Sequence, residues 1–403
     1  MEKSEVLSFV DGCIHDAAAP CACACPFRLD VRAFLKKAAK GRVPAAYKDY
    51  RTAVIFPRIV SALCPAPCRE RCQRKLLGDE PLDMQAIERA VVRLAGAQEP
   101  VVYPIQPKDT PIAVVGAGPA GLAFALGMAQ KKYPVTVFEK ESDLGGALRT
   151  HPEFPDFEAD IRAQLAGEKL ELRFGAEVKS LDELDAYSII YIATGSGGAD
   201  FGLGESWEPE GFSTRNPKAL MGGGLCEIGT VQAIADSLTL GRIAENLLMT
   251  GRAEDPQPVP ACPEHRLFPE DTPKAEHVAP ADPAAGYTKE ELKAEAGRCM
   301  LCKCERCVKD CPVLAKFNKP PLQMAMEVLA DSGAHFLASR TMTRETYSCT
   351  ECGRCGAACP EKQDMGELFH FSKLARAKDG IAPEALHAFW MEELAFTMEQ
   401  GFL

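Results

Sequence analysis

Four cysteines near the C-terminus have the spacing that holds an iron–sulfur cluster. Residues 349–360 read C-x2-C-x2-C-x3-C-P, a run that ligates [4Fe–4S] clusters and whose fourth cysteine serves a neighbouring cluster. Zinc is the alternative, but a zinc site is built from two C-x2-C pairs and has no use for the trailing Cys-Pro. The run therefore predicts one cluster held by Cys349, Cys352 and Cys355, and a second cluster that takes Cys359.

A second cysteine run lies upstream, with one spacing shortened. Residues 302–312 read C-x-C-x2-C-x3-C-P, and Cys299 is a spare cysteine that is able to replace Cys302. If the last cysteine of each run serves the other cluster, Cys311 completes the downstream cluster. The upstream cluster is then held by Cys302, Cys304, Cys307 and Cys359, with the choice between Cys299 and Cys302 left open.

Seven more cysteines lie near the N-terminus, between positions 13 and 72. They form a C-x7-C-x-C-x-C-P run and then a C-x3-C-x3-C group. Clustered cysteines in a reducing compartment are typical of metal ligands rather than disulfides, whereas buried thiols without metal are the alternative for the first three. The seven are Cys13, Cys21, Cys23, Cys25, Cys64, Cys68 and Cys72.

A glycine-rich turn predicts a nucleotide site. Residues 116–121 read GAGPAG between an apolar strand and a helix of small residues, and Glu139 ends the next strand. In such a βαβ unit Gly116 makes the tight turn, Gly118 lets the backbone approach a pyrophosphate, and Gly121 lets helix and strand pack closely. The helix N-terminus adds positive potential for phosphate, and Glu139 can hydrogen-bond a ribose hydroxyl. The ligand is FAD or a nicotinamide nucleotide, unless the site is an empty relic.

The pattern of the chain divides it into three modules and a linker. Residues 1–103 carry apolar side chains three and four apart, which predicts helices, and residues 104–250 alternate strands and helices. Residues 251–287 are rich in Pro and Ala and predict a semi-rigid linker, and residues 288–403 return to helical patterns. We therefore expect a multidomain α/β plus α fold, in which a helical iron–sulfur domain, a Rossmann-like domain and a helical ferredoxin follow one another.

Composition argues against several classes of protein. The 403 residues carry a formal net charge of −11 and have a pI of about 5.3, which disfavours non-specific binding to nucleic acid. A mean hydropathy of −0.12, with no apolar run of about 18 residues, disfavours a membrane span. The N-terminus has no basic segment followed by an apolar one. We expect a cytoplasmic protein whose 18 cysteines stay reduced.

The C-terminal segment resembles a known group of helical ferredoxins. Cys311 and Cys349 are separated by 37 residues with a helical pattern, too many for a compact bacterial ferredoxin. Residues from roughly 295 to 375 resemble the α-helical ferredoxins found in the iron–sulfur protein of succinate dehydrogenase and in the C protein of heterodisulfide reductase. The resemblance implies two [4Fe–4S] clusters in this segment.

The N-terminal cysteines resemble the iron–sulfur domain of the glutamate synthase small subunit and of dihydropyrimidine dehydrogenase. That family reads C-x2-C-x4-C-x3-CP, and after a longer spacer it has a further group of three cysteines. The resemblance implies one cluster held by Cys25, Cys64, Cys68 and Cys72.

A second N-terminal cluster is less fully matched. Cys13 and Cys21 fit the family pattern, but Asp16 stands where the family has its second cysteine. The family also has a Gln or Glu ligand that falls near Glu88, and Cys23 is an extra cysteine that could substitute. The fourth ligand stays open between Asp16, Cys23 and Glu88, and so does the presence of this cluster.

Further motifs resemble the FAD-binding half of the same family. They are the GGxLR turn at 145–149, the ATG strand end at 193–195 and the closing segment 217–246. The family's ribityl-binding Asp is replaced by Gly224, a role that Glu227 could take over. The resemblance implies FAD, held by Gly116, Gly118, Pro119, Ala120, Gly121, Glu139, Lys140, Gly146, Arg149, Val178, Ala193, Thr194, Gly195 and Gly224.

One family domain has no counterpart. The family inserts a complete NAD(P)H-binding domain after ATG, whereas fewer than about 30 residues separate Gly195 from the closing glycines, too few for a second βαβ unit. We therefore expect the electron-transfer subunit of a multi-subunit anaerobic oxidoreductase, which passes electrons between FAD and several [4Fe–4S] clusters, three or four in all.

A catalytic partner subunit would then handle the substrate, and a further subunit would connect to NAD(P)H or ferredoxin. No catalytic residue of this chain stands out. A stand-alone flavin-dependent reductase and a cluster-conducting scaffold with a vestigial flavin site are the alternatives. The sequence leaves open the substrate, the direction of electron flow and whether the flavin bifurcates electrons.

Overall fold

The computed structural model describes residues 3–96, 104–257, 262, 272–333, 343–380 and 384–400. These residues form two compact units. The large unit contains the described residues of 18–262 and 273–301, and the small unit contains those of 1–17 and 302–403, together with Thr272. The chain therefore leaves the small unit after residue 17 and enters it again after residue 301.

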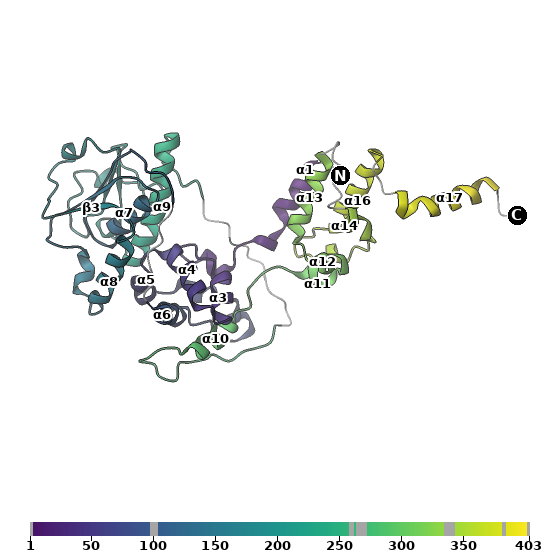
Figure 1. Cartoon of the computed structure of the whole chain (residues 1–403), viewed down its shortest axis with the longest axis horizontal. Helices are drawn as coiled ribbons and strands as arrows, with labels where there is room; N and C mark the ends of the chain where they lie inside the picture. The colour runs from purple at the N-terminus through teal and green to yellow at the C-terminus, as the bar shows by residue number, and fades with distance from the viewer. Residues whose placement is uncertain are drawn as a thin grey trace. The chain divides into compact units, whose positions relative to one another are not determined.

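The first part of the large unit is a bundle of short helices. Asp30 and Asp83 cap two of them, since their carboxylates accept hydrogen bonds from the backbone N–H of Ala33 and of Ala86. One helix comes from far along the chain, because α10 packs against α3 and α6 (Figure 1). The bundle contains α2 (Pro20–Cys23), α3 (Val31–Ala39), α4 (Val43–Val54), α5 (Pro57–Leu63), η2 (Pro67–Arg69), η3 (Gln73–Leu77), α6 (Met84–Ala95) and α10 (Lys289–Gly297).

The rest of the large unit is built on a parallel five-stranded sheet of order β3-β2-β1-β4-β5. The strand order reverses at β1, and ligands of such sheets bind beyond the carboxyl ends of the strands at this point. The strands are β1 (Ile112–Val115), β2 (Val135–Glu139), β3 (Leu170–Phe174), β4 (Ile189–Ile192) and β5 (Ala219–Met221). The helices are α7 (Pro119–Gln130), α8 (Phe154–Leu165), α9 (Thr230–Thr250) and the short η4 (Gly146–Thr150), η5 (Leu181–Leu184), η6 (Gly204–Ser206) and η7 (Gly223–Cys226).

The two faces of the sheet bury separate cores. In β1, Ile112 and Val114 belong to the core shared with α7, α9 and the helical bundle, whereas Ala113 and Val115 belong to a second core. This alternation follows from the pleat of a strand. The second core is closed by loop residues such as Leu203, with Trp207 packed against it.

The small unit is helical. Its first helix, α1, packs against α13, as Figure 1 shows, and buries Val6 and Phe9. The same core contains Met324, Val328 and residues of α16. The elements are α1 (Lys3–Gly12), η1 (Ile14–Asp16), α11 (Arg306–Asp310), α12 (Pro312–Phe317), α13 (Pro321–Gly333), α14 (Thr343–Ser348), α15 (Arg354–Ala358), α16 (Met365–Lys378) and α17 (Glu384–Gln400).

The multidomain α/β plus α fold is confirmed. The grouping of the modules differs in two respects. The segment before residue 18 belongs to the small unit with the C-terminal segment, and residues 288–301, expected at the start of the ferredoxin, belong to the large unit. Of the expected linker, residues 258–261 and 263–271 lie outside the described residues, while Tyr287 at its end is buried in the large unit. In the described part of the chain, no helix combines the length and apolar character that a membrane span needs.

Candidate cofactor sites

The glycine-rich loop between β1 and α7 requires glycine at two positions. Gly116 has a φ of +110°, and a Cβ there would collide with the carbonyl oxygen of Ala193 at the end of β4. A Cβ on Gly121 would overlap the carbonyl oxygen of Gly116 and lie 3.2 Å from Val114 Cγ1. These glycines therefore allow the loop, α7 and β4 to approach closely, as in a dinucleotide-binding βαβ unit.

Other glycines border open space beside this loop. A Cβ on Gly118 or on Gly195 would meet no atom within 4 Å. Across the space, a Cβ on Gly146 would lie 3.0 Å from Gly118 Cα, and one on Gly224 would lie 3.3 Å from the backbone nitrogen of Ser196. Glycines, which have no side chain, therefore surround the place where β1 and β4 end and α7 begins. We call this set the glycine cradle: Gly116, Gly118, Gly146, Gly195 and Gly224.

Glu139 braces the cradle from below. It is buried at the end of β2, and its carboxylate accepts hydrogen bonds from the backbone N–H of Ala117 at 2.6 Å and of Glu141 at 3.0 Å. A carboxylate has about four lone-pair sites, so these two bonds leave capacity for a ribose hydroxyl. That role of Glu139 stays a prediction.

The remaining predicted nucleotide contacts differ in placement. Pro119 and Ala120 begin α7. Arg149 donates a hydrogen bond from Nε to the carbonyl of Leu144 at 2.8 Å and so braces the turn before the cradle. Thr194 donates to a backbone carbonyl at 2.9 Å. Lys140 is exposed, and Val178 is buried in the core on the sheet face away from α7.

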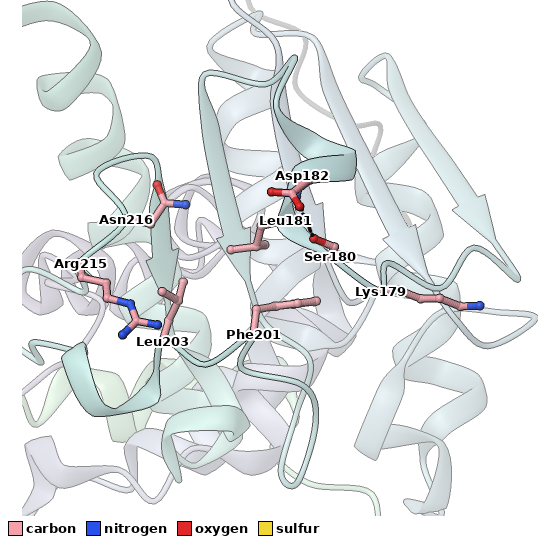
Figure 2. Close-up of a pocket in the computed structure, with 8 residues that line it drawn as sticks. All are labelled: Lys179, Ser180, Leu181, Asp182, Phe201, Leu203, Arg215 and Asn216. Carbon is pink, nitrogen blue, oxygen red and sulfur yellow. Dashed lines mark hydrogen bonds between the residues drawn. The ribbon is translucent and has the colours of Figure 1, made fainter.

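The segment between β4 and β5 folds back over the sheet. Residues 193–218 are all described, and they contain only η6 and isolated bridges. Trp207 packs on the second core and donates from Nε1 to the carbonyl of Met221 at 3.1 Å. A hollow of about 560 Å³ lies on this face. Figure 2 shows the side chains that line it, among them Leu181, Phe201 and Leu203. No residue of the glycine cradle lines it. A short loop thus covers the sheet where the resembling family inserts its NAD(P)H domain.

Three cysteines of the large unit lie near one buried carboxyl group. Cys64, Cys68 and Glu88 are buried, and the Glu88 carboxylate accepts a hydrogen bond from the Tyr50 hydroxyl at 3.0 Å. Burial, with smaller contributions from nearby Glu88 and Cys25, raises the pKa of Cys64 to about 11, and the same causes raise the pKa of Cys68. Burial also raises the pKa of Glu88 to about 7. Three thiols and one carboxyl group therefore form a four-donor set.

Cys72, expected in that set, lies beside Cys299 instead. Burial, with a smaller contribution from the charge of nearby Cys72, raises the pKa of Cys299 to about 11. A hydrogen bond joins the two segments that carry these cysteines, since Arg74 donates from Nε to the carbonyl of Arg298 at 2.6 Å. Cys21 packs against the same core as both thiols. The helical bundle thus brings a cysteine from residue 299 to the N-terminal cysteines.

Two cysteines lie away from these sets. Burial and then a hydrogen bond with Cys262 raise the pKa of Cys23 to about 11, so Cys23 is paired with a cysteine that no motif includes. Cys226 packs against the second core of the sheet, and burial raises its pKa to about 11.

Cys13 lies among the cysteines of the C-terminal motifs. Burial, with smaller contributions from nearby Cys13, Cys304 and Cys359, raises the pKa of Cys307 to about 12. The converse holds for Cys13, whose pKa is raised by burial and then by Cys359 and Cys304. Asp16 follows on the same segment and is exposed. Four thiols from three stretches of the chain are therefore close enough for their charges to interact.

The downstream motif forms a second group in the small unit. The pKa of Cys349 is raised by burial and, among smaller contributions, by the charge of Cys311. Cys355 is buried, and its Sγ lies 3.0 Å from Asp364 Oδ1. Cys352 is exposed. The Cys355 thiol and Asp364, which also caps α16, fix the end of the motif against that helix.

The chemistry of these donors fits iron–sulfur clusters. Cysteine thiolates hold [4Fe–4S] clusters, and ligation takes up thiols as thiolates and releases their protons. Within the described residues, no three His, Cys, Asp or Glu side chains converge as they would around one metal ion. A cubane of four irons and four sulfides is larger than an ion, so its ligands surround it from farther apart. Residues of both units can therefore hold clusters.

Family comparisons match all three modules. Residues 1–99 match dihydropyrimidine dehydrogenase domain II with its 4Fe-4S cluster, residues 114–168 match an NAD(P)-binding Rossmann-like domain, and residues 298–364 match a 4Fe-4S dicluster domain. The chain therefore contains more than one 4Fe–4S domain and a Rossmann-like domain.

Individual relatives support the resemblance given above. The beta subunit of NADP(+)-dependent formate dehydrogenase from Moorella thermoacetica is 29% identical over 229 residues, which is 48% of this chain and 32% of that protein. The small chain of glutamate synthase [NADPH] from Mycobacterium tuberculosis is 35% identical over 150 residues, 34% of this chain and 30% of that protein. The PreT subunit of NAD-dependent dihydropyrimidine dehydrogenase from Escherichia coli is 29% identical over 174 residues, 42% and 41% of the two chains. The chain thus spans less than half the length of each relative.

Proposed function

We propose that this chain is the electron-transfer subunit of a multi-subunit oxidoreductase and passes electrons between FAD and several [4Fe–4S] clusters. The observation that carries the proposal is the combination of a glycine cradle with cysteine groups in both units. No side chain of the described residues stands out as a catalytic group. The chain then connects redox partners and leaves the substrate to another subunit.

FAD is the proposed occupant of the glycine cradle. Gly118 and Gly195 leave open space beside the N-terminus of α7, which suits a pyrophosphate, and Glu139 would bind the ribose. FAD takes up two electrons together or singly whereas each cluster carries one, so bound flavin would supply the exchange between the two. The replacement of the family Asp by Gly224 specifically favours a second candidate, a scaffold with a vestigial flavin site.

We propose that the cysteine groups bind three or four [4Fe–4S] clusters as resident cofactors. Two would occupy the small unit, as the match to a dicluster domain supports. In the large unit, Cys25, Cys64, Cys68 and Glu88 would hold one, with Glu88 in the place expected for Cys72. A further cluster would use Cys21 and Cys72. All 18 cysteines are described as thiols outside any disulfide, which supports a reducing compartment such as the cytoplasm.

The proposed partners are other redox subunits. The relatives named above include subunits of oxidoreductases whose names contain NADP(+) or NAD, and this chain has only a short loop where the resembling family binds NAD(P)H. A catalytic subunit and an NAD(P)H- or ferredoxin-linked subunit would therefore supply what this chain lacks.

Anaerobic purification of the full chain, followed by iron, sulfide and flavin counting, tests the proposal. Three to four [4Fe–4S] clusters correspond to about 12 to 16 irons per chain. Fewer than about eight irons would contradict a multi-cluster relay, and absence of flavin would favour the scaffold. Addition of NADH or NADPH to the isolated chain should leave the flavin absorbance unchanged over the first seconds. Rapid bleaching would show that the chain accepts hydride without a partner.

A further inference from the structure

Two cysteines are placed by the fold with motifs other than those that contain them in the sequence. We propose that Cys13 is the fourth ligand of the cluster held by Cys304, Cys307 and Cys359, and that Cys299 joins Cys21 and Cys72 in the large unit. The N-terminal segment thus lends a ligand to the ferredoxin, and the segment before the ferredoxin lends one to the N-terminal domain. This inference rests on the clusters proposed above and not on the flavin or the partners.

The position of Cys13 is fixed by the helix that precedes it. Val6 and Phe9 of α1 are buried in the small-unit core, and Cys13 packs against the same core as Cys307. The backbone N–H of Cys13 donates to the carbonyl of Phe9 at 3.1 Å. Cys13 is therefore held at the end of a packed helix and not on a loose terminus.

The residues on either side of Cys13 touch both halves of the ferredoxin motif. His15 Nδ1 lies 2.8 Å from the carbonyl oxygen of Cys304. A Cβ on Gly12 would lie 2.7 Å from Nε2 of Gln363, four residues after Cys359. Because its neighbours border residues 304 and 363, Cys13 lies between the two stretches that supply the other three thiols.

A second observation points to a ligand at this place. His15 is only 5% exposed, and its Nε2 is buried without a hydrogen-bond partner. Nδ1 donates to the carbonyl of Cys304, because a carbonyl oxygen only accepts. A buried polar atom without a partner is uncommon in a folded protein and is explained by a group or water bound next to it. The position of Nε2 therefore supports a bound group beside Cys13.

Cys299 is held in the large unit by a buried ion network. The Arg298 guanidinium lies 2.6 Å from Glu295 Oε1 and donates to the carbonyl of Glu80 at 2.7 Å. Glu295 in turn accepts from the backbone N–H of Asp83 at 3.2 Å. These bonds join the end of α10 to the start of α6. Cys299, the next residue, is thereby fixed beside the N-terminal cysteines.

Iron counting in paired variants of the full, anaerobically purified chain tests the proposal. Cys13→Ala and Cys359→Ala should each lose about four irons, or leave a three-iron cluster that EPR of the oxidised protein detects. Since both residues would serve one cluster, the double variant should lose no more than the irons of that cluster, about four. Cys302→Ala should keep the iron of the native chain. Cys72→Ala and Cys299→Ala should be non-additive in the same way.

Matched controls separate ligation from packing. Val10→Ala removes apolar volume from α1, the helix that ends directly before Cys13, without removing a thiol, and it should keep the native iron content. Cys13→Ser keeps the size of the side chain and should change the EPR spectrum of one cluster. Full iron in Cys13→Ala, or a loss of about eight irons in its double variant with Cys359→Ala, would overturn the inference. A native chain with fewer than about eight irons would refute the proposed function itself.

Discussion

Two glycines of the glycine-rich loop, Gly118 and Gly121, differ in what an added methyl group would meet. We therefore expect Gly121→Ala to lower the stability of the fold and Gly118→Ala to weaken FAD binding. A Cβ on Gly121 would overlap the backbone carbonyl of Gly116 and approach Val114 Cγ1 at 3.2 Å. Backbone cannot rotate away as a side chain can, so α7 must move away from β1. Overpacking typically costs about 1–3 kcal/mol, and we expect about 3 kcal/mol here.

Gly118→Ala should leave the fold intact. Gly118 has a φ of −78° and a ψ of 177°, which any residue adopts, and its Cβ would meet no atom within 4 Å. The lower backbone entropy of alanine in the unfolded chain is worth about 0.4–1 kcal/mol, and the poorer capping by alanine offsets it by a similar amount. The same methyl group would occupy the space through which a pyrophosphate reaches the backbone. A steric cost of about 1–3 kcal/mol weakens FAD binding about 5- to 150-fold.

Thermal unfolding followed by circular dichroism, together with FAD titration, distinguishes the two effects. For a unit of this size, about 1 kcal/mol corresponds to about 2–4 °C, so Gly121→Ala should melt about 6–12 °C below the native chain. Gly118→Ala should melt within about 2 °C of it but bind FAD more weakly. If Gly121→Ala melts like the native chain, the close packing of the loop is wrong. If Gly118→Ala binds FAD normally, the cradle does not receive the pyrophosphate.

Three further predictions concern other parts of the large unit. Gly224→Asp, whose Cβ would lie 3.3 Å from the nearest backbone atom, should raise the flavin content per purified chain, measured by absorbance, because it restores the family's ribityl ligand. Arg298→Ala leaves the buried Glu295 without its 2.6 Å ion pair, so chemical denaturation should show a loss of about 3–5 kcal/mol. Burial raises the pKa of Asp160, whose Oδ2 accepts from the backbone N–H of Arg58 at 2.9 Å. Stability from this group is therefore present below the unfolded pKa of about 4 and lost as pH rises through the raised pKa. The melting temperature of the native chain should accordingly fall, relative to that of Asp160→Asn, as the pH rises from about 4 through the raised pKa of Asp160.

The parts of the structure that sequence predicts well are those set by neighbours in the chain. The GAGPAG turn largely specifies its own conformation, since Gly116 has a φ of +110°, which favours glycine, and a Cβ on Gly121 would overlap the carbonyl oxygen of Gly116 five residues before it. The helices α6 and α13 follow from apolar spacing, which reports one buried face. The replacement of the NAD(P)H domain by a short loop follows from chain length alone.

The assignment of thiols to sites depends on tertiary packing and is not contained in the spacing. Cys72 has the spacing of a partner for Cys64 and Cys68, but the packing of α6 brings Glu88 to them instead. One signal in the sequence would have favoured a different site for Cys13. Val6 and Phe9 lie on one side of α1, which predicts that this helix packs against another element. Nothing in the sequence says which helix that partner is.

The departures from family spacing have a common structural origin. Cys13 and Cys21 lie on either side of residue 17, where the chain leaves the small unit, and Cys299 and Cys302 lie on either side of residue 301, where it enters again. At each of these two places, cysteines that form one run in the sequence are divided between the two units. Cys13 packs against the core of the small unit, and Cys299 packs against the core of the large unit. The C-x7-C spacing after Cys13 and the extra cysteine at position 299 then have the same explanation. In the proposed assignment, Cys13 serves a cluster of the small unit, and Cys299 serves a cluster of the large unit. Ligation would close loops that span most of the chain, but closure entropy grows only with the logarithm of loop length. The exchange therefore adds little cost beyond that of a ligand from the unit's own motif.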